Sequence, residues 1–272
     1  MRPSPASWVP PGAWLAPGYA EWRPPAALRG PVACLWASVV PDDDDAGQGL
    51  VRGPVLPDAC SDLIWEQGVG AYVAGPDTGP VATAARPGTV MVGVRFRPAA
   101  GGQVLRLPLS EVRDQRVPLA DLRPRAALGL PATLAPAAAA AVLLDLTGVL
   151  IADSTRDPAI DEAASLLRDP SARTEDIADR VGLSERQFRR RSHAAIGYGP
   201  KTLQRILRFQ RVVRLLDAAA ELPDLASLAA LAGYADQPHL TRECRALSGR
   251  TPTDLHRVRG GGRLLGPSHP PR

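Results

Sequence analysis

The chain is 272 residues long, enough for about two domains, and carries 32 Lys and Arg against 28 Asp and Glu, a net charge of +4. No stretch approaches the ~20 apolar residues of a membrane span; the closest, 137–150, contains Asp145. Cys34, Cys60 and Cys244 form no CxxC pair and leave an odd number, which argues against a disulfide framework and for a reducing, cytoplasmic location.

Short β-strands are expected through the N-terminal half, after a proline-rich start at residues 1–11 that contains no apolar run and so no secretory signal. Strand-like runs, separated by Gly and Pro, lie at 32–40, 50–56, 62–65 and 71–74. Residues 90–97 alternate Val and Phe with Met, Gly and Arg, which is the period of a half-buried strand. Many short strands divided by turn residues predict a small β-barrel or a double-sheet jelly roll over residues 1–125.

A small-molecule pocket in this half is one hypothesis, because such pockets combine aromatic side chains with a few convergent polar groups. Its candidate lining residues are Asp58, Asp62, Trp65, Arg95 and Arg97. The alternative is that Trp65 belongs to the hydrophobic core and that the charged residues lie at its rim.

Metal and cofactor sites are not expected. The first histidine of the chain is His193, and Cys34 and Cys60 are far apart, so this half lacks a cluster of transition-metal ligands. The acidic run at 42–45 lacks the spacing of a calcium loop and predicts a solvated turn. A catalytic N-terminal half, for example one that transfers a methyl group in DNA repair through Cys34 or Cys60, would need an activating base or metal. The absence of histidine argues against this alternative, and we do not expect an enzyme.

Residues 126–157 are rich in Ala and Leu and predict a helical linker that packs on the barrel or on a second subunit. The arginine excess of the chain lies between Arg168 and Arg214, whereas the first 159 residues are slightly acidic. Such an asymmetry is typical of a nucleic-acid-binding surface.

Residues 174–191 have the first of two helix-turn-helix patterns. Ile177, Ala178 and Val181 form the apolar stripe of a short helix. Gly182 follows, and a tight turn between helices favours a residue that tolerates positive φ. Ser184 and Gln187, three residues apart, then predict the capping box of a second helix.

The second helix of this pattern places Phe188 inward and Arg186, Arg189 and Arg190 outward, because Arg186 and Arg190 differ by only ~40° of rotation. Arginine bonds guanine bidentately in the major groove and also reaches phosphates. A solvated surface helix is the alternative, but the preceding helix and turn favour the DNA-binding interpretation.

Residues 225–244 repeat the pattern. Leu225, Leu228, Ala229 and Ala232 form the apolar stripe, Gly233 is the turn, Tyr234 fills the corner, and Asp236 and Pro238 open the second helix. Leu240 and Cys244 face inward, and Gln237, His239 and Arg242 face outward. Between the two patterns, residues 199–217 predict a rigid helix of roughly sixteen residues, about 24 Å long, which could hold two recognition helices near one ~34 Å DNA turn apart.

The chain resembles the AraC/XylS transcriptional regulators over residues 160–258. The resemblance is carried in the first half by Ala178, Leu183, Ser184, Gln187, Arg190, Gly197 and Pro200. It is carried in the second half by Ala229, Gly233, Tyr234, Gln237, His239, Leu240, Thr241, Arg242, Gly249, Thr251 and Pro252. The family usually has bulky apolar residues in place of Ser192 and Cys244, and an apolar residue in place of Arg191. Residues 56–65 and 94–98 are similar to a cupin-like sensor domain.

The resemblance implies an α+β chain, with a cupin-like sensor or dimerisation domain at 1–125 and a seven-helix DNA-binding domain at 158–259, on either side of the helical linker at 126–157. Residues 260–272, which begin with three Gly and are Pro-rich from Pro267 onward, predict a disordered tail. The resemblance also implies transcriptional control through major-groove contacts. The residues it implies for DNA contact are Arg186, Arg189, Arg190, Gln237, His239, Thr241 and Arg242. Expected partners are double-stranded DNA, with a small-molecule effector, RNA polymerase and a second copy of the chain as further possibilities, and no membrane. A non-sensing N-terminal domain that only dimerises is the remaining alternative.

Overall fold

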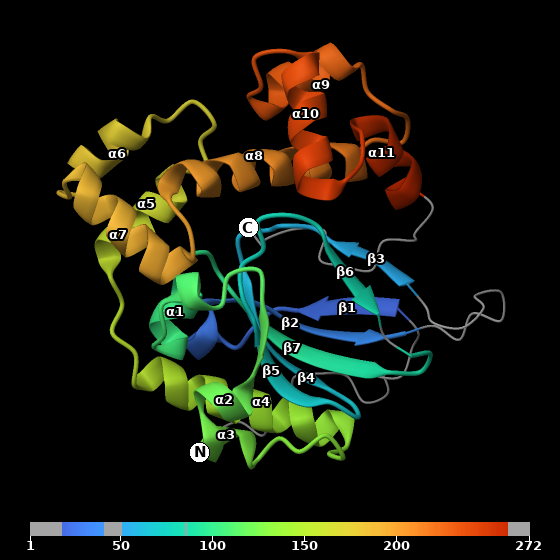
Figure 1. Ribbon diagram of the computed structural model, residues 1–272, viewed down its shortest axis with the longest axis vertical. Coiled ribbons are helices and arrows are strands. Elements are labelled where there is room, and N and C mark those ends of the chain that lie inside the picture. The colour runs from blue at the N-terminus through green and yellow to red at the C-terminus, as the bar shows by residue number, and fades with distance from the viewer. Residues whose placement is uncertain (1–17, 41–50, 85, 261–272) are drawn as a thin grey trace.

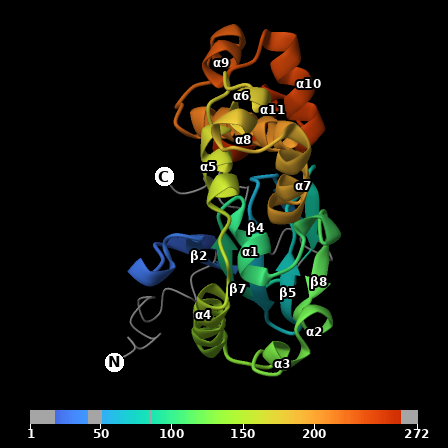
Figure 2. The same cartoon turned by 90° about the vertical axis from the view of Figure 1, so that its left-hand side faces the viewer.

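The computed structural model describes residues 18–40, 51–84 and 86–260. The expected tail beyond residue 260, the acidic run at 42–45 and the proline-rich start lie outside the described residues. The predicted fold class is confirmed: a β-rich N-terminal domain precedes an all-helical domain. The helical domain sits on one end of the N-terminal domain (Figure 1 and Figure 2).

The strands of the N-terminal domain form two antiparallel sheets. The larger has six strands in the order β1-β2-β7-β4-β5-β8, and the smaller pairs β3 with β6. The bounds are β1 Gly18–Trp22, β2 Val32–Val39, β3 Val51–Val55, β4 Ser61–Glu66, β5 Gly70–Ala74, β6 Val81–Ala84, β7 Val90–Phe96 and β8 Arg116–Pro118. No ladder in the described ranges joins β1 to β8, so the larger sheet is open and the arrangement is a double sheet and not a closed barrel.

Short helices accompany these sheets. They are η2 Ala26–Leu28, α1 Ala100–Leu105, η3 Leu109–Glu111, α2 Leu119–Leu122 and α3 Pro124–Ala127. The longer α4, Pro136–Ala152, packs on the face of the large sheet that β4 and β7 present, where Leu63, Val92 and Val94 meet Leu143 in one buried cluster. The segment expected as a linker is therefore a layer of the N-terminal domain, and we propose a domain boundary near residues 153–157.

Seven helices follow in the described part of the chain. They are α5 Pro158–Leu166, α6 Thr174–Arg180, α7 Glu185–Ile196, α8 Pro200–Asp217, α9 Leu225–Ala232, α10 Gln237–Ser248 and α11 Pro252–Gly260. α8 connects the groups α5–α7 and α9–α11 (Figure 1). Its apolar side, with Leu203, Ile206, Phe209 and Val213 fully buried, forms the axis of one hydrophobic core that reaches from α5 to α11. None of the described helices has the length and apolar character needed to cross a bilayer.

The two domains pack tightly against each other. Ala59 and Ala99 of the N-terminal domain belong to the core of the helical domain. α1 approaches α7 so closely that a Cβ on Gly102 would lie 2.7 Å from the carbonyl oxygen of Ala194, which is why this position requires glycine. The Gln210 amide of α8 also donates to the carbonyl oxygen of Pro57 at 2.7 Å. The C-terminal end of α7 is thus fixed against the N-terminal domain.

Candidate nucleic-acid interface

The first helix-turn-helix motif comprises α6 and α7, and the local signals in the sequence account for its geometry. Ile177 and Ala178 of α6 are buried. The turn passes through Gly182 at φ +69°, in the left-handed region that glycine adopts without strain. The Ser184 hydroxyl accepts a hydrogen bond from the backbone N–H of Gln187. The side-chain oxygen of Gln187 accepts one from the backbone N–H of Ser184, so the predicted capping box is present.

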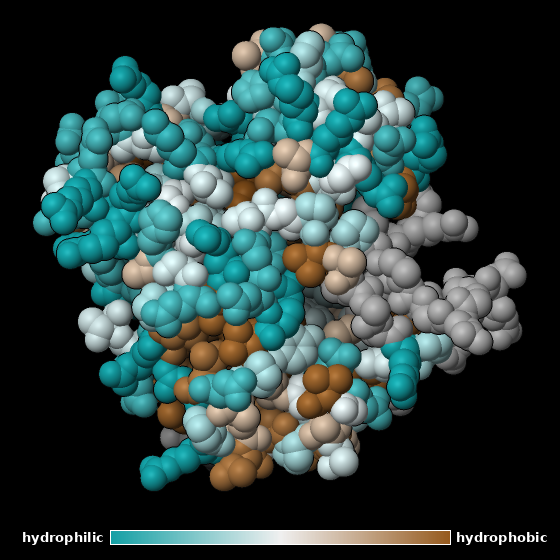
Figure 3. Space-filling view, viewed as in Figure 1, coloured by the Kyte–Doolittle hydropathy of each residue, from teal (hydrophilic) through white to brown (hydrophobic). Residues whose placement is uncertain are grey.

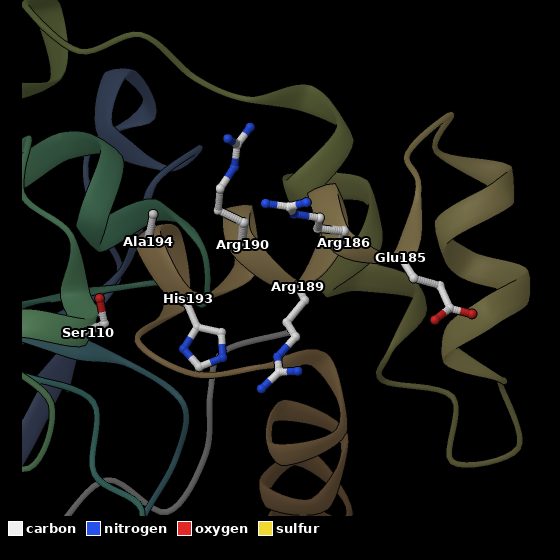
Figure 4. Close-up of a pocket in the computed structure, with 7 residues that line it drawn as sticks. All are labelled: Ser110, Glu185, Arg186, Arg189, Arg190, His193 and Ala194. Atoms are coloured by element: carbon white, nitrogen blue, oxygen red, sulfur yellow. The ribbon is translucent and has the colours of Figure 1, made fainter.

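The outward face of α7 is cationic and open. Phe188 is 2% exposed, whereas Arg186, Arg189 and Arg190 are exposed. No ion pair within the described ranges engages these three guanidinium groups. They line a hollow of about 740 Å³ together with Glu185, His193, Ala194 and Ser110 (Figure 4). On the face shown in Figure 3, hydrophilic side chains cover the region over α6 and α7.

His193 is a candidate contact that the sequence analysis missed. It follows Arg186 by seven residues and Arg189 by four, so it continues the same face of α7. Its imidazole lies beside the hollow in Figure 4. Partial burial and the nearby positive charges of Arg189 and Arg113 lower the pKa of His193, so the imidazole is favoured in its neutral form. The spacing i, i+3, i+4, i+7 would have identified this residue.

The second motif comprises α9 and α10 and has the same construction. Leu228, Ala229 and Ala232 are buried, and Gly233 lies at φ +85°. The Asp236 carboxylate caps α10 by accepting from the His239 amide nitrogen at 2.6 Å.

The predicted contact residues of α10 are spread over more than one side of this helix and differ in exposure. Gln237 and Arg242 are exposed, and His239 and Thr241 are half-buried. The His239 ring meets the Tyr234 ring edge-on, with centroids 5.1 Å apart. Arg242 and Gln237 are therefore free to reach a groove, whereas His239 is held by an aromatic neighbour.

α8 sets the spacing of the two motifs. It has 18 residues, about 27 Å at 1.5 Å per residue, slightly longer than the sequence predicted. The Arg205 guanidinium of α8 pairs with Glu243 of α10, and the Arg208 guanidinium lies 5.4 Å from the centroid of the Tyr234 ring. These contacts fix α10 on the spacer, so the two recognition helices have a defined separation.

Of the three departures from the AraC/XylS pattern, the structure explains that of Arg191. Ser192 and Cys244 are fully buried, and the Ser192 hydroxyl has no hydrogen-bond partner among the described residues. Arg191 lies to the side of the outward face, 3.2 Å from the Asp157 carboxylate, whose other oxygen caps α5. Arg191 therefore joins α7 to α5 and is not directed to the hollow.

The five residues suggested for an N-terminal pocket are only partly brought together. Arg95 is 4% exposed; its Nη2 donates to Asp62 at 3.2 Å and its Nη1 lies 3.4 Å from Asp58. Trp65 lies on the opposite face of the sheet, fully buried, with its indole nitrogen donating to Pro131. Arg97 follows the end of β7 and donates to the carbonyl oxygen of Arg29. The predicted pocket is therefore corrected to a buried Asp58–Asp62–Arg95 cluster, while Trp65 is a core residue, as the alternative held.

No metal dependence is expected of the protein. The described residues contain no group of three His, Cys, Asp or Glu side chains placed to hold a metal ion. Elemental analysis of the purified full chain, before and after a chelator, should show no stoichiometric transition metal. A bound metal whose removal unfolds the N-terminal domain would contradict this prediction and favour a catalytic N-terminal half.

Two family models match the chain. Residues 177–257 match a helix-turn-helix domain, and residues 20–118 match a domain of unknown function (DUF6597). No curated protein matches the chain. The first match covers α6 in part and α7–α10 completely, and so includes both recognition helices.

Solved structures of ToxT from Vibrio cholerae are distantly similar. An apo variant of ToxT is 11% identical, with 85% of this chain and 97% of ToxT covered at a TM-score of 0.42. ToxT with a bound unsaturated fatty acid is 12% identical, with 77% and 90% covered at 0.40. ToxT bound to (E)-4-(8-methylnaphthalen-1-yl)but-3-enoic acid is 10% identical, with 89% and 99% covered at 0.43.

Proposed function

We propose that this chain is a DNA-binding transcription regulator of the AraC type, whose C-terminal helix-turn-helix domain reads one bipartite DNA site with both α7 and α10. The observation that carries the proposal is the pair of outward polar faces on α7 and α10, both fixed to α8: α7 leads into its first residue, and Arg205 of α8 pairs with Glu243 of α10. Two helices held about one DNA turn apart, ~34 Å, reach successive major grooves on one side of a duplex.

The residues proposed for base or phosphate contact are those of the sequence analysis with one addition. On α7 they are Arg186, Arg189, Arg190 and His193. On α10 they are Gln237, His239, Thr241 and Arg242. Arginine recognises guanine, glutamine recognises adenine, and threonine and histidine serve base edges or phosphates.

The DNA-binding domain should act on its own. Apart from Ala59 and Ala99, the buried members of its core all lie between residues 160 and 255, so a fragment of residues 155–262 keeps its own core. We expect this fragment to fold and to select the same bipartite sequence as the full chain from a random duplex library.

The measurement separates two failures. If the fragment is helical and soluble but binds selected DNA no more tightly than random DNA, while the full chain discriminates, the N-terminal domain is required for recognition. If the full chain also fails to discriminate, the proposed function is wrong.

We propose that the N-terminal domain is a sensor or dimerisation domain and not a catalytic one. Burial raises the pKa of the Cys34 and Cys60 thiols, so neither forms the reactive thiolate that methyl transfer needs. A small organic effector would act by different affinities for two states of the protein, and the close packing of α1 on α7 provides a direct connection to the DNA-binding face. A thermal-shift screen against small metabolites distinguishes a sensor from a domain that only dimerises or recruits RNA polymerase.

A further inference from the structure

The outward face of α7 ends against the N-terminal domain. Ser110, in η3, lines the same hollow as Arg186, Arg189 and Arg190 (Figure 4). A second hollow of about 510 Å³ adjoins it and shares Glu185, Arg189 and His193 with it. Arg113 and Thr78 of the N-terminal domain line this second hollow, together with Lys201 at the start of α8. The two hollows therefore place side chains of the N-terminal domain close to Arg189 and His193.

The charge of this junction favours an anion. Arg113, in the turn after η3, contributes a positive charge, as do Arg189 of α7 and Lys201 of α8. Glu175 and Glu185 are the carboxylates that line the second hollow. Glu175 lies 3.9 Å from Lys201, and Arg113 lies 3.7 Å from the exposed Asp114. Both ion pairs are long and solvent-exposed, so they bind these cations weakly.

The position of the junction along α7 identifies the anion. Recognition helices direct their N-terminal residues to base edges. His193 lies seven residues beyond Arg186 on the same face, roughly 10 Å along the axis, which is comparable with the ~12 Å width of the major groove. The strand backbone that borders the groove therefore passes the C-terminal turn of α7, where Ser110 and Arg113 lie. Serine and arginine are common partners of DNA phosphates.

We propose that the N-terminal domain is part of the DNA interface: Arg113, assisted by Ser110, binds a backbone phosphate that borders the groove read by α7. The inference rests on the proposed DNA-binding function. It gives the N-terminal domain, otherwise proposed only to sense a ligand or to dimerise, a direct contribution to the affinity for DNA. The Arg113 guanidinium is suitably placed, since its side chain is 41% exposed and its Nη1 lies 3.5 Å from the carbonyl oxygen of Gly197, just beyond α7.

The test is the salt dependence of DNA binding by the full chain. Each phosphate contact contributes about 0.9 to the slope of log K against log salt. Arg113→Ala should lower this slope by about 0.9, so that its affinity deficit shrinks roughly threefold between 50 and 200 mM salt, with the preferred sequence unchanged. Arg125→Ala is the matched control, because it removes an exposed arginine from α3, at the end of the N-terminal domain away from the helical domain.

The outcomes are distinct. An unchanged slope in Arg113→Ala, or an equal decrease in Arg125→Ala, overturns the proposal while leaving DNA binding by the chain intact. Titration of inorganic phosphate without DNA, followed by thermal unfolding, identifies the alternative source of the anion: Arg113-dependent stabilisation at micromolar phosphate would assign the site to a free phosphate and overturn the DNA assignment. Failure of the full chain to select any sequence would instead refute the proposed function.

Discussion

Replacing Arg190 by Ala weakens binding to the selected DNA by ~1–3 kcal/mol, and replacing Arg242 by Ala causes a loss of similar size. Both side chains are exposed on the outward faces of recognition helices, and neither has an ion-pair partner in the part of the chain that the structure describes. Because the two residues lie on different motifs, the losses should add, so the double variant should lose roughly 2–6 kcal/mol.

Footprinting or fluorescence anisotropy at one fixed salt concentration measures these losses, and Arg125→Ala serves again as the control for removal of one charge. Sequence preference should relax at the half-site that each arginine reads. If both single variants keep the affinity and the preference of the parent chain, α7 and α10 are not the recognition helices, whatever their fold.

The helical domain could be predicted in detail because its signals are local. Ser184 and Gln187 form a capping box within four residues. Gly182 adopts the positive φ of the turn, a conformation that depends on this residue alone and not on its neighbours in space. The stripe on α8 has a clear helical period, so its buried face and its length could be predicted. Each of these features depends on residues close in sequence.

The N-terminal domain could be predicted only in class. α4 is apolar around most of its circumference, so its sequence does not show which face meets the sheet. The predicted pocket grouped Trp65 with Asp62, although residues three apart on a strand point to opposite faces. The alternation along β4 separates them, and Leu63 and Trp65 belong to the core that α4 covers.

The contacts of Ser110 and Arg113 with the recognition helix depend on the docking of two domains, and they join residues about eighty positions apart in sequence. The buried surface that fixes this docking comprises small residues, Ala59, Ala99 and Gly102, whose role shows only when the partner surface is present. His193 differs from these residues, because its spacing from Arg189 is by itself enough to place it on the outward face of the helix.

The largest loss of stability is expected from Arg95→Met. The Arg95 guanidinium is buried between the carboxylates of Asp58 and Asp62, and the Asp62 carboxylate also accepts from the Trp36 indole at 2.7 Å. Removing the cation leaves two carboxylates without their counter-charge in a site closed to water. Breaking such a buried pair costs about 3–5 kcal/mol, a large share of the ~5–15 kcal/mol that stabilises a typical domain.

The loss should depend on pH. Burial raises the pKa of Asp62 in the wild type, and Arg95 opposes this effect, so the pKa should rise further in the variant. A carboxyl group whose folded pKa is raised favours folding while it is protonated, and this contribution is lost as the pH rises through the folded pKa. The deficit of Arg95→Met relative to wild type should therefore be smaller near pH 4.5 than near pH 7.5.

Urea unfolding followed by tryptophan fluorescence measures this effect in the correct domain, since all 5 tryptophans lie in the first 65 residues. Arg116→Met is the matched control: the Arg116 pair with Asp77 has one partly exposed member, so its loss should cost less. The double variant Arg95→Met with Asp62→Asn should be more stable than Arg95→Met alone, because it removes one uncompensated charge. Equal stability of Arg95→Met and wild type at pH 7.5 would show that water reaches the cluster, and that Asp58 and Asp62 line an accessible site instead of a closed one.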